Sequence, residues 1–259
     1  MAVSLEDLPE LGLTMIVSNI VDEALAFVKE HCNAMTFNHV VRTAYWASIL
    51  VKKQIFSTAS VDLEAVIMSC ILHDMGWAET KSLLSKDNRF EVDGANIAAA
   101  FIRACQTDKI SDGKTSWNQS RVQRCWDAIA LHSTPSIARH AAAEVSLTCL
   151  AIMADFMGPA LPNSLGGENL ITMEEYRAVL RLYPRNGFTT EGLKHVMCGL
   201  CNTKPATTFD NFVGSFGLRF GTDGQGAGKK EFVRAWEENQ AANLLLSGLA
   251  GLEQLDARP

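Results

Sequence analysis

Apolar residues recur at helical spacing along most of this chain, and no segment shows a convincing alternating strand pattern. This periodicity predicts an all-α fold, a helical bundle with additional C-terminal helices. Thr172 to Glu175 has the form of a capping box, and Gly76 and Gly158 follow predicted helices as C-terminal glycines. Helices are predicted over residues 18–31, 37–56, 61–75, 93–106, 120–132, 142–157, 172–183, 189–201 and 229–251.

The length and composition are those of an ordinary globular protein. The 259 residues are 47% hydrophobic and 20% charged, enough to bury a core without disulfides. We expect a single domain, residues 1–259, with a core over roughly 30–160 and a C-terminal helical extension and loop over 161–259. The segment 202–228 carries six glycines and four phenylalanines. It is predicted to be a long loop ordered by packing of its phenylalanines on the rest of the chain.

The charge pattern limits the partners. The formal net charge is −6, and lysine and arginine are scattered, whereas nucleic-acid binding needs a clustered basic face. We therefore expect no nucleic acid and no membrane partner, since no apolar run approaches the ~20 residues of a membrane helix. The acidic stretch Met1–Glu10 does not resemble a signal peptide. The apolar stretch Ala241–Leu252 is a candidate homo-oligomer interface.

The seven cysteines indicate the compartment. The count is odd, and most cysteines lie within apolar helical runs, where a thiol acts as a small hydrophobe. A reduced, cytoplasmic protein is the prediction.

Four polar residues on predicted helices form a candidate metal site: His39, the pair His73-Asp74, and Asp155. Imidazole and carboxylate ligands suit divalent ions such as Zn, Mn, Fe, Co or Ni. Adjacent residues in a regular helix point about 100° apart. They can still bind one ion at a helix end, and Gly76 marks such an end.

The setting of these residues is more informative than the His-Asp pair itself. Six histidines and 13 aspartates predict about 0.3 such pairs by chance. However, Asp74 and Asp155 both lie in apolar runs, and a buried carboxylate costs several kcal/mol unless it is paired or binds metal. A buried Asp–His hydrogen bond or a capping role is the alternative interpretation.

The order His, His-Asp, Asp resembles the HD superfamily of metal-dependent hydrolases, and more closely its cyanamide hydratase-like members. The resemblance covers roughly residues 30–221. Its motifs are TFNHVVRTAYW at 36–46, CILHDMG at 70–76, RFEVDG at 89–94, AIALH at 128–132, YPRNGF at 183–188 and KPATT at 204–208. The chain departs from the family at Ser133-Thr134, where a Gln-Asp pair is expected, and at the bulky Trp77.

The resemblance implies an HD-type helical bundle that holds one divalent ion, zinc in cyanamide hydratases, through the four residues named. It implies addition of water to a small nitrile-like substrate, with cyanamide hydrated to urea. A bound metal lowers the pKa of its water towards ~7, which gives hydroxide as nucleophile.

The neighbouring polar residues receive roles from this chemistry. Glu91 is the candidate general base, and His132 the candidate proton donor or substrate-orienting group. Asn38 is a candidate hydrogen-bond donor to substrate, or a helix cap. Arg42 shares a helix face with His39 and is expected to pair with a metal-bound carboxylate. Tyr45 and Trp46 are expected in the core.

Three other functions remain open. An HD-type phosphohydrolase acting on a nucleotide or another small phosphate ester would need basic groups converging on the metal. A di-iron oxygenase would need further histidines, for which only His132 and His140 are available. A non-catalytic scaffold would not retain metal.

Overall fold

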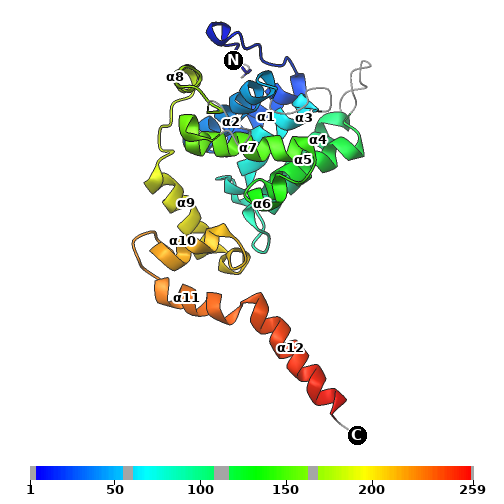
Figure 1. The fold of residues 1–259 in the computed structure, drawn as a ribbon, viewed down its shortest axis with the longest axis vertical. Helices are drawn as coiled ribbons and strands as arrows, with labels where there is room; N and C mark the ends of the chain where they lie inside the picture. The colour runs from blue at the N-terminus through cyan, green and yellow to red at the C-terminus, as the bar shows by residue number, and fades with distance from the viewer. Residues whose placement is uncertain (1–3, 55–60, 108–116, 163–168, 258–259) are drawn as a thin grey trace. The chain divides into compact units, whose positions relative to one another are not determined.

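The computed structural model describes residues 4–54, 61–107, 117–162 and 169–257, and in these the regular structure is helical. The predicted all-α fold is confirmed (Figure 1). The α-helices are α1 (Asn19–His31), α2 (Ala34–Lys52), α3 (Leu63–Leu72), α4 (Phe90–Thr107), α5 (Gln119–Leu131), α6 (Pro135–Ala138), α7 (Ala143–Met157), α8 (Met173–Leu182), α9 (Thr190–Thr203), α10 (Phe212–Phe220), α11 (Lys229–Glu238) and α12 (Ala241–Asp256). Short 3₁₀ helices are η1 (Pro9–Leu11), η3 (His73–Trp77), η4 (Lys81–Leu83), η5 (Gly158–Ala160) and η6 (Pro205–Thr208).

Two predicted segments differ from the structure. The long loop expected over 202–228 contains η6 and α10, so the prediction of a loop was wrong there. The Asn211 side chain caps α10 by accepting a hydrogen bond from the Val213 N–H, 3.0 Å away. The single helix expected over 229–251 is two helices, because the chain leaves the helical conformation at Gln240.

The chain forms two compact units. Unit 1 comprises Met1–Ser85 with Phe90–Phe188, and unit 2 comprises Lys86–Arg89 with Thr189–Pro259. The division at Phe188 lies later than the expected end of the core at residue 160. That the two units act as one domain stays a prediction.

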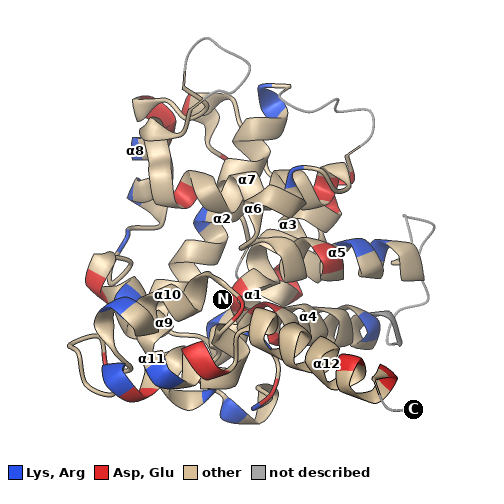
Figure 2. Cartoon of the chain, turned by 60° about the horizontal axis from the view of Figure 1, so that its bottom comes forward, with Lys and Arg blue, Asp and Glu red and all other residues tan. Residues whose placement is uncertain are grey.

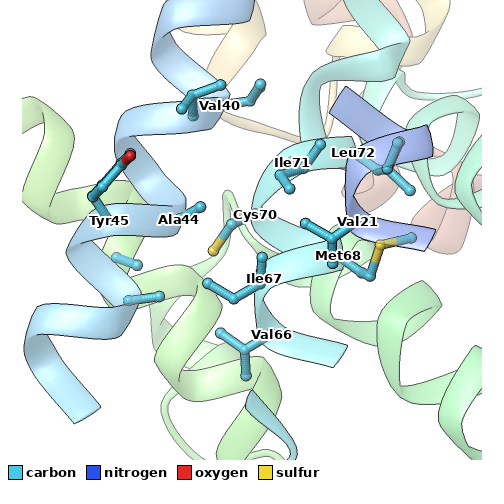
Figure 3. Close-up of a cluster of buried hydrophobic side chains, with 14 of the residues drawn as sticks. Val21, Val40, Ala44, Tyr45, Val66, Ile67, Met68, Cys70, Ile71 and Leu72 are labelled. Carbon is cyan, nitrogen blue, oxygen red and sulfur yellow. The ribbon is translucent and has the colours of Figure 1, made fainter. Parts of the chain in front are cut away.

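Unit 1 is a bundle around α3, whose residues from Ala65 to Leu72 are all buried. Helix α2 packs against α3 and α7, and α5 packs against α3, α4 and α7. Figure 3 shows the resulting core, with side chains of α3 facing Val40, Ala44 and Tyr45 from α2 and Val21 from α1. A helix buried on every side can hold a polar residue only at its end, where the backbone turns away from the core.

Side-chain caps fix where the helices of unit 1 begin. Asn33 accepts from the Thr36 N–H at 3.0 Å, and Asp62 from the Ala65 N–H at 3.1 Å. The capping box at Thr172 is confirmed, because the Glu175 side chain reciprocates. These caps set the register in which α2 and α3 present their histidines.

Unit 2 is built on α9, α10 and α11, which pack in sequence order. Phenylalanine rings pair within it, as in Phe209–Phe232, Phe212–Phe216 and Phe216–Phe220. In α12 six leucines are 56–74% exposed. The predicted interface at this helix stays a prediction.

Charge and hydropathy follow the bundle. Acidic and basic residues are intermixed along the helices in Figure 2. Residues Ala143–Ala160 are long and apolar enough to span a membrane, with mean hydropathy 1.2. However, 56% of that stretch is buried inside the structure, as expected for the core helix α7 of a globular protein.

Candidate metal centre

The His-Asp pair lies where α3 ends. His73 caps the helix, and His73–Trp77 continues as the 3₁₀ turn η3. Asp74 leaves the helical region, with φ −98° and ψ 19°. This conformation is sparsely populated and is common for residues in active sites. The sequence argument therefore holds: two adjacent side chains can serve one ion because the helix stops between them.

Three ligand atoms converge at this turn. His39 Nε2 lies 3.2 Å from His73 Nε2 and 3.4 Å from Asp74 Oδ2, and His73 Nε2 lies 3.2 Å from Asp74 Oδ2. Two ligands held 2.0–2.1 Å from one tetrahedral zinc ion would lie about 3.3–3.4 Å apart. All three residues are buried, and the group could hold a metal ion.

The histidine rings are oriented by their other nitrogen. His39 Nδ1 is 2.7 Å from Asp155 Oδ2, and His73 Nδ1 is 2.8 Å from the Cys70 carbonyl. A proton on Nδ1 satisfies each acceptor and leaves the Nε2 lone pair available to a metal. Such contacts to carboxylate and carbonyl oxygens are typical of metal-ligating histidines.

Asp74 shows the signature of a missing ligand. Both carboxylate oxygens are buried, and neither accepts a hydrogen bond from the described residues. Burial raises the pKa of Asp74, but His73 and His39 outweigh this effect and the pKa is lowered. An ionised, buried carboxylate without hydrogen-bond donors is costly. A cation between Asp74 and the two histidines would offset that cost.

The structure does not place Asp155 among these ligand atoms. Its Oδ2 faces His39 Nδ1, and its Oδ1 accepts from Arg42 Nε and Trp46 Nε1, both at 2.8 Å. Arg42 Nη2 also donates to Oδ2 at 2.8 Å. With both oxygens engaged, Asp155 has the position of a residue that orients the ligand His39. The sequence pattern could not distinguish this from direct ligation.

Helix α2 supplies the residues that hold Asp155. His39, Arg42 and Trp46 are spaced by three and four residues, so one face of α2 presents all three. Arg42 is expected from the sequence to pair with a carboxylate at the site, and it pairs with Asp155. Trp46 is in the core as predicted, but its indole hydrogen bond to Asp155 is a role the sequence analysis missed. The helical spacing from His39 was the available signal.

Two glycines let η3 lie directly on α4. A Cβ on Gly76 would lie 2.0 Å from the Phe90 carbonyl oxygen, and one on Gly94 would lie 2.7 Å from the His73 carbonyl oxygen. Gly76 is not among the described glycines with positive φ, so its expected role as a C-terminal cap is corrected. Its role is close approach. Gly158 does end its helix with a positive φ of 52°.

This close packing places Glu91 and His132 beside the centre. His132 Nε2 lies 4.0 Å from Asp74 Oδ1, and its Nδ1 is 2.7 Å from the Ile129 carbonyl. Burial, with His73 nearby, lowers the pKa of His132 to about 4, so the ring is neutral at pH 7. The Ser133 hydroxyl donates a short hydrogen bond to Glu91, which is buried.

Asn38 has a structural partner. Its amide donates to the Pro184 carbonyl at 3.0 Å, which ties α2 to the segment after α8. Its predicted hydrogen bond to substrate stays a prediction.

Aromatic rings surround the ligands. The Phe188 ring stacks on His39 with centroids 4.2 Å apart, and Phe156 lies 5.6 Å from His39. Trp77 is nearly parallel to the His39 ring at 6.3 Å, and Phe90 lies 5.6 Å from His132. Among the described residues, none of the four side chains His39, His73, Asp74 and His132 forms an ion pair with a lysine or arginine.

No protein-family model matches the chain, and no curated protein matches it.

Proposed function

We propose that this chain is a metal-dependent hydratase or hydrolase of the HD type that adds water to a small nitrile-like molecule, with cyanamide as substrate and urea as product. The observation that carries the proposal is the convergence of His39 Nε2, His73 Nε2 and the unpartnered Asp74 carboxylate within 3.4 Å of one another. The resemblance of the sequence motifs to cyanamide hydratase-like proteins supports the reaction class.

His39, His73 and Asp74 would hold one divalent ion, zinc in the first instance, with Asp155 orienting His39. A divalent ion in such a site supplies Lewis acidity and makes water nucleophilic at neutral pH. The Nδ1 contacts of both histidines keep the Nε2 lone pairs directed at one point without reorganisation during turnover.

Glu91 and His132 move the protons in this proposal. Glu91 is held by the Ser133 hydroxyl and accepts a proton from the attacking water. His132 is neutral at pH 7, and its Nε2 is available to accept a proton, since its Nδ1 contacts a carbonyl. It can then deliver that proton to the nitrogen on which charge develops.

A small neutral substrate fits the surroundings better than a phosphate ester. Arg42, the buried cation nearest His39 on α2, has its guanidinium engaged by Asp155 and by the Pro184 carbonyl. The rings of Phe188, Phe156 and Trp77 around His39 carry no charge to neutralise a phosphate.

Metal content and urea formation, measured on the same samples, test the proposal. Wild type should retain one metal ion per chain by mass spectrometry and form urea from cyanamide. Asp74→Ala should lose both, and Glu91→Gln should keep the metal but lose 10²–10⁴-fold in rate. His195→Ala removes an exposed histidine and is the control that should keep both properties.

The failures differ in meaning. Metal retention without urea, but with cleavage of a phosphate ester, would replace this reaction with the phosphohydrolase alternative. No metal after reconstitution with Zn, Mn, Fe, Co or Ni would overturn the metal centre itself.

A further inference from the structure

Trp77 has a buried hydrogen-bond donor without an acceptor. Its indole Nε1 is shielded from solvent and has no partner among the described residues, although the ring as a whole is partly exposed. Indole is a donor only, so no other atom of the side chain can compensate. Buried polar groups are rarely left in this state, and each exception calls for an explanation.

Other tryptophans of the chain do have acceptors. Trp46 Nε1 donates to Asp155 at 2.8 Å, and Trp126 Nε1 donates to Asn96 Oδ1 at 2.9 Å. If Trp77 served only to pack against its neighbours, phenylalanine would fill most of the space without an unpartnered N–H. The N–H is therefore the part of Trp77 whose presence packing does not explain.

The position of Trp77 indicates where its acceptor would come from. The residue ends the same turn η3 that begins with His73 and contains Asp74. Its ring lies 6.3 Å from the His39 ring and 5.6 Å from the Phe90 ring. Asp74, three residues before it, also has buried atoms without hydrogen-bond partners. Unpartnered groups of opposite kind, an acceptor pair and a donor, thus occur on one short turn.

We propose that the Trp77 indole N–H donates a hydrogen bond to an acceptor atom of the small molecule bound at the His39–His73–Asp74 centre. The inference rests on the proposed metal centre and specifies the ligand class further. A two- or three-atom ligand held at 2.0–2.2 Å by the metal and accepting at about 2.9 Å from an N–H spans about 7 Å in total. That scale matches the 6.3 Å between the His39 and Trp77 rings. The ligand is a compact molecule with a nitrogen or oxygen acceptor opposite its metal-facing end.

Azide is a suitable probe, because it is a linear anion that ligates zinc and has a nitrogen acceptor at its far end. Zinc-loaded, ¹⁵N-labelled protein would be titrated with azide while the indole N–H resonances of its five tryptophans are followed by NMR. The Trp77 resonance is identified by its absence in Trp77→Phe. We expect it to move downfield as azide binds, and azide to bind roughly threefold to tenfold more weakly to Trp77→Phe.

Trp126→Phe is the matched control, since it removes an indole N–H whose acceptor is Asn96. It should leave azide affinity unchanged. Equal azide affinity of wild type and Trp77→Phe, both holding zinc, would overturn this inference alone. So would a wild-type Trp77 resonance that does not move at saturating azide, which decides the matter even if Trp77→Phe does not fold. A wild-type chain that binds no zinc would overturn both this inference and the proposed function.

Discussion

Replacing Asp155 by asparagine separates two roles that a buried carboxylate can have at this centre. In the structure Asp155 accepts hydrogen bonds from Arg42, Trp46 and His39, and both Asp155 and Arg42 are 0% exposed. Burial raises the pKa of Asp155, but His39 and Arg42 outweigh it, so the carboxylate is ionised at neutral pH. Asp155→Asn therefore leaves the Arg42 guanidinium buried without its counter-charge.

The cost follows from that uncompensated charge. Removing one partner of a buried ion pair costs about 3–5 kcal/mol of unfolding free energy. The whole stability of a typical domain is about 5–15 kcal/mol, so the loss is large enough to measure. Because the pair exists without a metal, the loss should appear in metal-free protein.

Asp74→Asn is the contrasting variant. Its carboxylate oxygens accept no hydrogen bond from the described residues, so removing the charge should change the stability of metal-free protein by less than about 1 kcal/mol or increase it. Zinc binding should behave in the opposite way. Asp74→Asn should abolish it, whereas Asp155→Asn should weaken it about 10–100-fold.

Urea unfolding of chelator-treated protein, followed by tryptophan fluorescence, provides the measurement. A Trp236→Phe background removes a fluorophore of unit 2, so that the remaining signal reports unfolding of unit 1. A loss below about 1 kcal/mol for Asp155→Asn would refute the reasoning. Complete loss of zinc binding in Asp155→Asn, with little change in metal-free stability, would restore the sequence prediction of Asp155 as a ligand.

Three further predictions test other parts of unit 1 and unit 2. Gly76→Ala should lower the unfolding free energy by about 1–3 kcal/mol, because its Cβ would overlap the carbonyl at the start of α4; Gly199→Ala, with open space around its Cβ, should be neutral or stabilising by up to about 1 kcal/mol in the same urea titration. Arg42→Lys should weaken zinc binding about 10–100-fold in a chelator competition, since lysine cannot bind a carboxylate through two parallel hydrogen bonds; unchanged affinity would argue against the positioning role. Burial raises the pKa of Asp62, but hydrogen bonds from Arg121 outweigh it and lower the pKa, so this stabilisation is present above about pH 4 and lost as pH falls through the folded-state pKa. Unfolding followed from pH 7 to pH 2 should therefore show Arg121→Gln less stable than wild type at pH 7 by an amount that shrinks in acid, and a constant difference would contradict this origin.

Much of the fold could be predicted from the sequence, because helix formation depends on local periodicity and caps. The capping box at Thr172 and most helix positions follow from residues within one or two turns of each other. The segment 202–228 was harder. Its glycines weaken the helical signal, and α10 is stabilised by contacts with α9 and α11, which are not local.

For the candidate site, the sequence alone determined which residues are chemically capable. Histidines and aspartates inside apolar runs must be paired or bind metal, and this requirement identified His39, His73, Asp74 and Asp155. Only the tertiary structure decided their relation: three ligand atoms within 3.4 Å, and Asp155 held on the far nitrogen of His39 by Arg42 and Trp46. The physical reason is that burial makes a carboxylate need a partner but does not specify which one. The partner depends on distances of a few ångströms between helices that are far apart in the sequence.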